Sequence, residues 1–192
     1  MQVTRHIFRQ DRIFNMLLAE LMDTTKTEEG SYIAVKLSKE TQDRLADFAN
    51  SFKIENIVPR EKFHITVIYS TKSVPKTFKA LGDIDPPILA QPKHLTIFET
   101  KGGSSALVLE LDCPELVKRH NDLMSKYNLK YDFPEYKVHV TLSYDVGDWE
   151  IPTVVDYKDI QDLEIVNEYL ESLKLDWVKT NTGINDENDS DA

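Results

Sequence analysis

The 192-residue chain has few cysteines and no long hydrophobic segment. It contains one cysteine, Cys113, so no disulfide can form within it, and we expect a reducing compartment. No apolar run approaches the roughly 20 residues that a membrane-spanning helix needs. The first residues also lack the apolar core of a signal peptide. These absences predict a globular protein without a membrane partner.

Positive charge is also scarce. Against 33 acidic residues stand 23 basic ones, which gives a formal net charge of −10. A protein that grips a long nucleic acid needs a broad basic surface, so we expect no such partner. A small phosphate-bearing ligand needs only a few local donors and remains compatible with this charge. Hydrophobic residues make up 41% of the chain, which is enough for a folded domain with its own core.

The sequence divides into three parts. Residues 11–22 carry apolar side chains at helical spacing and are followed by a polar stretch, so residues 1–30 are interpreted as a helical appendage and linker. Residues 179–192 are acidic and have almost nothing to bury, which predicts a disordered tail. The main domain is expected over residues 31–178.

This domain begins with a strand–helix–strand passage. Residues 32–37 are rich in β-branched side chains and predict a strand. Ser38 is a candidate N-cap for the helix that follows, and residues 63–70 predict the next strand.

A second passage repeats that order. Asp112 is expected to cap its helix, with Pro114 near the first position and His120 on a face that packs. The expected strands are 94–100 and 106–112, joined by a glycine turn, then 137–143, and finally 163–169 and 173–177, which close the sheet. The repeated order predicts a two-lobed α+β protein with approximate internal symmetry.

Each passage ends in a His-x-Thr triplet on a strand. Alternate side chains of a strand share a face, so His64 lies with Thr66 and His139 lies with Thr141. The opposite face of each strand is apolar and suited to a core. The polar faces are therefore expected to line a shared groove.

Two imidazoles across a groove suit phosphodiester cleavage. A neutral ring can accept a proton from the attacking oxygen while a protonated ring supplies the leaving oxygen. The unperturbed histidine pKa near 6.5 permits either role near neutral pH, so the assignment of acid and base stays open. Threonine hydroxyls can donate to the non-bridging phosphate oxygens.

Two other interpretations of the histidines are a structural role and metal binding. With 5 histidines in the chain, about 0.4 His-x-Thr triplets arise by chance, so one triplet alone would mean little. Two triplets in mid-strand favour a shared catalytic site over structural histidines. A metal site would need further Cys, His or carboxylate ligands, and the strand neighbours are hydroxyls and aliphatics. We therefore expect no metal and no cofactor.

The paired triplets, 75 residues apart, resemble the 2H phosphoesterase superfamily. The blocks around them, with Ser31–Lys36 and Pro114–His120, are similar to the phage anti-CBASS cyclic-oligonucleotide phosphodiesterases. The resemblance covers residues 31–178. It implies a LigT-like fold in which antiparallel sheets are related by a pseudo-two-fold axis and flanked by helices.

The resemblance also implies a function and a site. Such enzymes hydrolyse the 3′–5′ linkages of cyclic di- and trinucleotide messengers, such as 3′,3′-cGAMP, in the cytoplasm of the infected bacterium and so evade CBASS defence. Phe98 stands where the family would have a tryptophan, a departure that weakens stacking on a base. The implied catalytic residues are His64, Thr66, His139 and Thr141, and the implied substrate-binding residues are Tyr32, Phe98, Glu171 and Trp177.

Two alternatives remain open at this point. One is a 2H enzyme that acts on 2′,3′-cyclic ends of RNA, and the other is a non-catalytic sponge for cyclic nucleotides. The sequence does not define the base preference, the ring size of the ligand or the oligomeric state.

Overall fold

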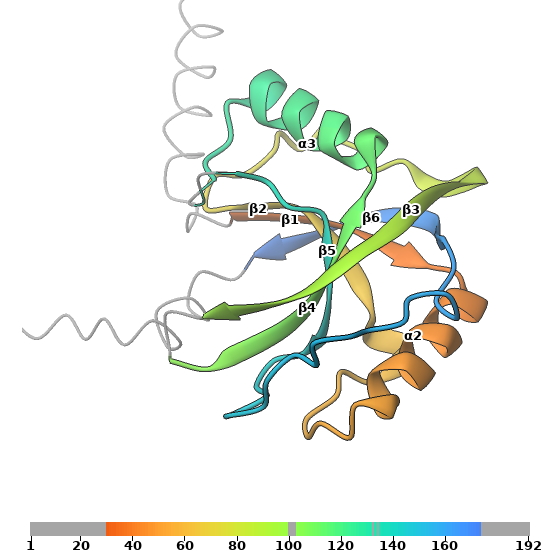
Figure 1. Ribbon diagram of the computed structural model, residues 1–192. Helices are drawn as coiled ribbons and strands as arrows, with labels where there is room; N and C mark the ends of the chain where they lie inside the picture. Colours follow the sequence, from red (N-terminus) through yellow and green to blue (C-terminus); the bar gives the residue numbers. More distant parts are fainter. Residues whose placement is uncertain (1–29, 100–102, 132, 134, 174–192) are drawn as a thin grey trace, which may run out of the picture.

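A computed structural model describes residues 30–99, 103–131, 133 and 135–173 (Figure 1). The expected helix at residues 11–22, the acidic tail and the strand expected from Leu173 to residue 177 fall largely outside these residues. In the part described, no helix is long and apolar enough to cross a membrane.

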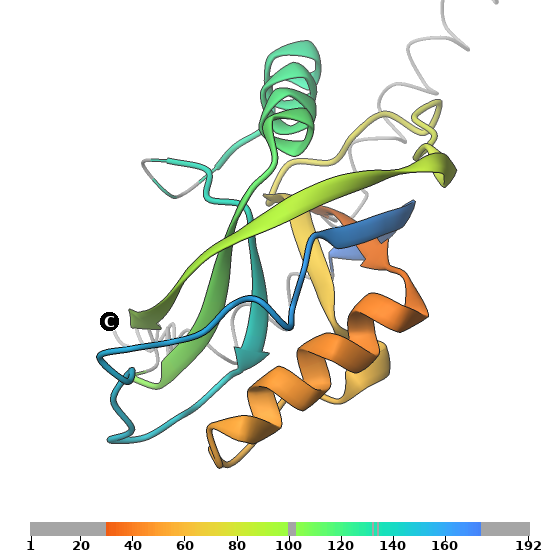
Figure 2. The ribbon, with the colours of Figure 1, turned by 45° about the vertical axis from the view of Figure 1, so that its right-hand side comes forward.

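Six antiparallel strands form a closed barrel in the order β1-β2-β5-β4-β3-β6. Helices α2 and α3 lie on opposite sides of it, at the bottom and the top of Figures 1 and 2. The strands are β1 Gly30–Leu37, β2 His64–Ser70, β3 Gly82–Glu99, β4 Ser105–Asp112, β5 His139–Ser143 and β6 Leu163–Leu173, the helices are α2 Lys39–Ser51 and α3 Pro114–Tyr127, and a 3₁₀ turn covers Arg60–Lys62. The expected α+β class is confirmed.

The strand order carries the expected internal symmetry. One half runs β6-β1-β2 and the other runs β3-β4-β5, so the halves are related by an approximate two-fold axis between β2 and β5. In each half a helix joins the two inner strands, α2 between β1 and β2 and α3 between β4 and β5. The pairing of β3 with β6 closes the barrel.

The two helices begin differently. Ser38 caps α2 as expected, because its Oγ accepts a hydrogen bond from the Thr41 amide at 3.2 Å. The expected cap of α3 at Asp112 is wrong. Asp112 is the last residue of β4, paired with Gln91, and Cys113 takes the N-cap position without a side-chain hydrogen bond. Pro114 lies in the first turn, where its missing N–H costs the helix no hydrogen bond.

Two strands are longer than the sequence pattern predicted. β3 starts at Gly82 rather than at residue 94, and it pairs first with β6 and then with β4. The prolines in this segment argue against a strand in the sequence, because a proline donates no hydrogen bond to the ladder. The ladder shifts register between Asp83 and Ile88, around Pro86 and Pro87, and again just after Pro92. β6 likewise continues from Leu163 to Leu173 without the break expected after residue 169.

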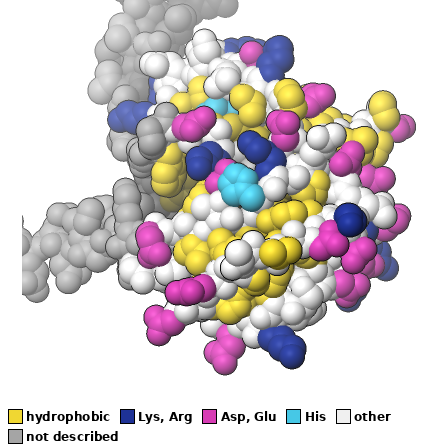
Figure 3. Space-filling view, in the orientation of Figure 1, with side chains coloured by type: hydrophobic (Ala, Val, Ile, Leu, Met, Phe, Trp, Pro, Cys, Tyr) yellow, Lys and Arg dark blue, Asp and Glu magenta, His cyan; other side chains and the backbone are white. Residues whose placement is uncertain are grey.

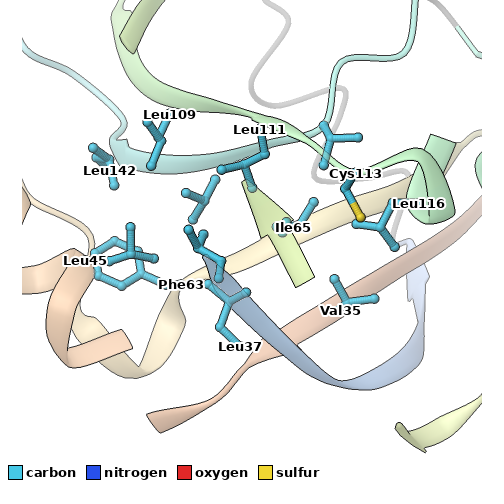
Figure 4. Packing of buried hydrophobic residues seen from close by; sticks show 14 of the residues in the cluster. Val35, Leu37, Leu45, Phe63, Ile65, Leu109, Leu111, Cys113, Leu116 and Leu142 are labelled. Atoms are coloured by element: carbon cyan, nitrogen blue, oxygen red, sulfur yellow. The ribbon is translucent and has the colours of Figure 1, made fainter. Parts of the chain in front are cut away.

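The core lies inside the barrel and extends to both helices (Figure 4). The apolar faces expected on β2 and β5 are buried, as Ile65 and Val140 illustrate with no exposed surface. Leu45 of α2 and Leu116 of α3 pack onto the same cluster. The core therefore takes one face of each triplet strand and leaves the other face for polar side chains.

A buried ion pair ties the two halves together. Glu168 of β6 is 1% exposed and accepts two hydrogen bonds from the Arg119 guanidinium of α3, at 2.7 and 2.9 Å. One of its oxygens also accepts the Leu81 amide at 3.0 Å, just before β3. A single carboxylate thus joins β6, α3 and the start of β3.

Replacing Glu168 by Gln is expected to destabilise the fold by about 3 kcal/mol, because it leaves a partly buried guanidinium without its counter-charge. Chemical denaturation measures this change in the free energy of unfolding. The control is Asp122→Asn, which breaks an exposed ion pair with Lys118 on the same helix and should cost less than about 0.5 kcal/mol. Equal effects of the two substitutions would contradict the prediction.

Candidate active site

The barrel brings the two His-x-Thr triplets onto neighbouring strands. β2 and β5 are antiparallel, and Ile65 pairs with Val140. Counting one residue along each strand from this pair brings His64 beside Thr141 and Thr66 beside His139. Opposite residues of an antiparallel pair share a face, so all four side chains lie on the face turned away from the core. The two histidines occupy diagonal positions, which in an antiparallel pair are typically about 7–8 Å apart and within reach of long side chains.

Both imidazoles are held in the same tautomer. The Nδ1 atom of His64 lies 2.8 Å from the carbonyl oxygen of Lys62, and Nδ1 of His139 lies 2.8 Å from the carbonyl oxygen of Lys137. A carbonyl oxygen can only accept, so Nδ1 donates in both rings. In the neutral ring Nε2 then carries the lone pair, and in the protonated ring Nε2 carries the transferable proton.

An aromatic ring contacts each histidine edge-on. Tyr32 of β1 meets His64 with ring centroids 6.0 Å apart, and Phe98 of β3 meets His139 at 5.2 Å. The Tyr32 hydroxyl also lies 3.1 Å from Oγ1 of Thr66. Burial raises the pKa of Tyr32 well above its ordinary value, so the hydroxyl stays protonated and can donate.

The face continues from β1 onto β6. Glu171 lies opposite Tyr32 in the β1–β6 ladder, so the structure brings these two predicted residues together. Trp177, the fourth predicted binding residue, lies outside the described residues. Lys36 is exposed, sits opposite His64 across β1–β2 and holds its ammonium 5.1 Å from the centre of the Tyr169 ring.

Sequence reasoning missed Lys36 and Tyr169, although strand alternation could have found the first. Tyr32, Ala34 and Lys36 are alternate residues of β1, so a groove-facing Tyr32 implies a groove-facing Lys36. Nothing in the sequence shows that Tyr169 lies beside them, because that depends on the register between β1 and β6.

Two side chains support β2 where it leaves β5. The Tyr136 hydroxyl donates to the carbonyl oxygen of Thr66 at 2.8 Å, and Nδ1 of His120 donates to that of Val67 at 2.7 Å. The Tyr136 and His120 rings stack 4.0 Å apart and parallel within 1°. Val67 is the extra residue of a bulge opposite Ile33 and Ala34, which leaves its carbonyl free for His120. The expected packing of His120 is confirmed, since only 4% of it is exposed.

Metal ligands are not gathered at this face. Within the described ranges, no group of three or more His, Cys, Asp or Glu side chains could hold a metal ion. Hydroxyls, carbonyl oxygens and lysine ammonium groups lie near the histidines. The Glu110 carboxylate opposite His139 is paired with the Lys137 ammonium, so the face as a whole suits an anion better than a cation.

Comparison with known proteins identifies the family. The family model of the anti-CBASS protein Acb1 matches residues 29–180. The chain belongs to the Acb1 family. It is 37% identical to the Acb1 protein of Enterobacteria phage T4 over 163 residues, or 82% of this chain and 97% of that protein. It is also 33% identical to the Acb1 protein of Vibrio phage KVP40 over 153 residues, or 80% of this chain and 93% of that protein.

Solved structures agree on the fold. The apo crystal structure of Escherichia coli LigT superposes with a TM-score of 0.54 at 15% identity and covers 76% of this chain and 88% of LigT. LigT complexed with 3′-AMP superposes with a TM-score of 0.51 at 12% identity and covers 75% of this chain and 87% of LigT. At such identities the likeness concerns the fold alone. It confirms the expected 2H phosphoesterase architecture for this Acb1 family member.

The two histidines of this family member differ in their surroundings. Burial lowers the pKa of His139 below its ordinary value, and the charges of His64 and Lys137 act in the same direction. The hydrogen bond to the Lys137 carbonyl and the charge of Glu110 oppose this change. A lowered pKa keeps His139 largely neutral at pH 7, the form that can accept a proton.

Replacing Tyr136 by Phe is expected to destabilise the protein by about 1–2 kcal/mol, because the Thr66 carbonyl loses its donor in a partly buried place. Thermal or chemical denaturation measures the loss. Tyr131→Phe is the matched control: its ring also contacts His120, but its hydroxyl donates no hydrogen bond within the described part of the chain. A Tyr136→Phe protein as stable as the Tyr131→Phe protein would contradict the expectation.

Proposed function

We propose that this Acb1 family member is a metal-independent phosphodiesterase that hydrolyses 3′–5′ linkages of cyclic di- and trinucleotide messengers, such as 3′,3′-cGAMP. It would act inside the infected bacterium, so that CBASS defence is not triggered. The observation that carries the proposal is the pair of imidazoles on adjacent strands, both in the tautomer that leaves Nε2 for proton transfer. Family membership and the 2H phosphoesterase fold support it.

The reaction assigns one role to each histidine. Neutral His139 accepts the proton of a ribose 2′-hydroxyl, whose oxygen attacks the adjacent phosphorus. Protonated His64 donates its proton to the departing 5′-oxygen as the P–O5′ bond breaks. Water then opens the 2′,3′-cyclic phosphate with the roles reversed, which leaves a linear product with a 3′-phosphate and restores both rings. Thr66 and Thr141 donate to the non-bridging oxygens as their charge grows.

The rim of the face supplies contacts to the bases and phosphates. Tyr32 and Phe98 offer rings for the bases, and such stacking contributes about 1–3 kcal/mol per base. Glu171 can accept from a base amino group beside Tyr32, and Lys36 places positive charge beside His64 for a phosphate. Trp177 remains a prediction of the sequence. On the face seen in Figure 3, acidic and basic side chains are interspersed without a broad basic surface, which suits a small ligand better than a long nucleic acid.

A cyclic dinucleotide with a 2′-deoxyribose at one linkage tests the mechanism. Cleavage at that linkage is expected to stop, because the attacking oxygen is missing, while the remaining ribose linkage of the same molecule is still cut and serves as an internal control. Chromatography with mass detection identifies the products. Turnover in EDTA should equal turnover without it. Cutting at the deoxy linkage would exclude 2′-hydroxyl attack, and loss of activity in EDTA would call for a metal.

A substrate panel tests the biological assignment. Cyclic di- and trinucleotides are expected to be cleaved in preference to RNA that ends in a 2′,3′-cyclic phosphate. His64→Ala and His139→Ala should each lower kcat by about 10²–10⁴-fold. Preference for RNA ends would indicate an RNA-processing enzyme instead. A double alanine variant that still protects phage from CBASS in an infection assay would indicate a sponge.

A further inference from the structure

The approximate two-fold symmetry of the barrel is broken by charge at one pair of equivalent positions. β1 flanks β2 in one half as β4 flanks β5 in the other. The β1 residue opposite His64 is Lys36, and the β4 residue opposite His139 is Glu110. Equivalent places in the two halves therefore hold a cation beside one histidine and an anion beside the other.

Glu110 is buried, which makes its charge costly unless neighbours compensate it. It is 7% exposed, and the only other buried carboxylate in the described part of the chain is Glu168, which an arginine neutralises. Glu110 instead lies 3.2 Å from the Lys137 ammonium and 3.5 Å from Nε2 of His94 on β3. Burial raises the pKa of Glu110, but hydrogen bonds from Lys137 and Thr96 outweigh burial and hold the pKa below its usual range. The carboxyl is therefore ionised.

Lys137 contacts both His139 and Glu110. Its carbonyl oxygen accepts the Nδ1 proton of His139 at 2.8 Å, and its ammonium pairs with Glu110. The same ammonium lies 5.9 Å from the centre of the Phe98 ring, which contacts His139 edge-on. Lys137, Glu110 and Phe98 thus surround the His139 ring on the side of β3 and β4.

His64 has the same backbone hydrogen bond as His139 but no carboxylate opposite it. Its Nδ1 also donates to a carbonyl two residues earlier, that of Lys62. Opposite it across β1–β2, however, stands Lys36 in place of a carboxylate. The backbone device that sets the tautomer is common to both halves, and the buried carboxylate belongs to the His139 half.

We propose that Glu110 is a positioning residue of the active site, which anchors Lys137 and supplies the negative charge that stabilises the imidazolium of His139 after that ring has accepted the substrate's proton. The catalytic part of this proposal rests on the proposed function. The charge arrangement around His139 rests on the structure alone.

A consequence for titration follows from the groups that face His139. These are Glu110 from β4, Lys137 two residues before β5, Thr66 and His64 from β2, and Phe98 from β3. Glu110 is the one negative charge among them, and it favours the protonated ring, whereas Lys137 disfavours it. Removing Glu110 should therefore move the titration of His139 to lower pH, and removing the Lys137 ammonium should move it to higher pH.

The direct test is an NMR titration of the histidine ring protons without substrate, on the full chain. We expect Glu110→Gln to lower the midpoint of His139 and Lys137→Met to raise it, with the resonance assigned through its loss in His139→Ala. Asp112→Asn is the matched control, since it removes the same charge from an exposed residue on the same strand and face, and it should leave the midpoint unchanged. Circular dichroism verifies that each variant is folded. A general loosening of the site would shift the His139 midpoint in the same direction in both variants. Opposite shifts therefore show an effect of charge and not of structural disruption.

Kinetics tests the catalytic part. With a cleavable cyclic dinucleotide, Glu110→Gln should lower kcat about 10-fold with little change in KM and move the acidic limb of the kcat–pH profile to lower pH. Glu110→Asp, which keeps the charge, should recover part of kcat, and Asp112→Asn should behave as the unmodified protein. An unmoved His139 midpoint, shifts of the same sign in both variants, or a kcat within twofold of the unmodified protein would overturn the proposal. If no cyclic nucleotide is cleaved at all, the proposed function fails, and the NMR titration still decides whether Glu110 controls the charge of His139.

Discussion

The site depends on one short contact between strands. β2 and β5 come from different halves of the chain and pair through Ile65 and Val140. The side chains of these two residues point into the core. The residues next to them on each strand are the two histidines and two threonines, whose side chains point to the opposite face. Any slip of this pairing by one residue would turn the polar side chains into the core and the aliphatic ones into the groove. Burial of the core therefore holds the two His-x-Thr triplets in register.

Because the contact is short, its surroundings must hold it. β2 bulges at Val67, whose carbonyl oxygen accepts from His120, and the neighbouring Thr66 carbonyl accepts from Tyr136; the His120 and Tyr136 rings stack on each other. On the far side of the barrel, Glu168 binds Arg119 and the chain before β3. Both devices use polar groups inside the protein, where an unpaired group is costly, and this makes them specific as well as stabilising.

A symmetric scaffold must still distinguish two chemical roles. In the proposed reaction one ring accepts a proton and the other donates one, yet both rings stand on equivalent strands with equivalent hydrogen bonds. On the flanking strands, Lys36 and Glu110 occupy equivalent positions with opposite charge. In the proposed reaction, Glu110 would stabilise the imidazolium that forms on His139, and His64 has no such carboxylate opposite it. Electrostatics can thus break a symmetry that the backbone preserves, at the cost of burying one carboxylate among its partners.

Local pattern in the sequence determined the strand–helix–strand passages, the shared face within each His-x-Thr triplet and the apolar face behind it, because alternation and capping act over a few residues. The lengths predicted for β3 and β6 were wrong, because partners distant in the chain set where these strands begin and end. The predicted N-cap of α3 was also wrong, because Asp112 pairs within the β3–β4 ladder. The tertiary structure decided which distant residues lie together: His64 with His139, Tyr32 with Glu171, and Glu110 with His139. Each of these pairs joins residues from different strands, and only the closed barrel and its register bring them to one face.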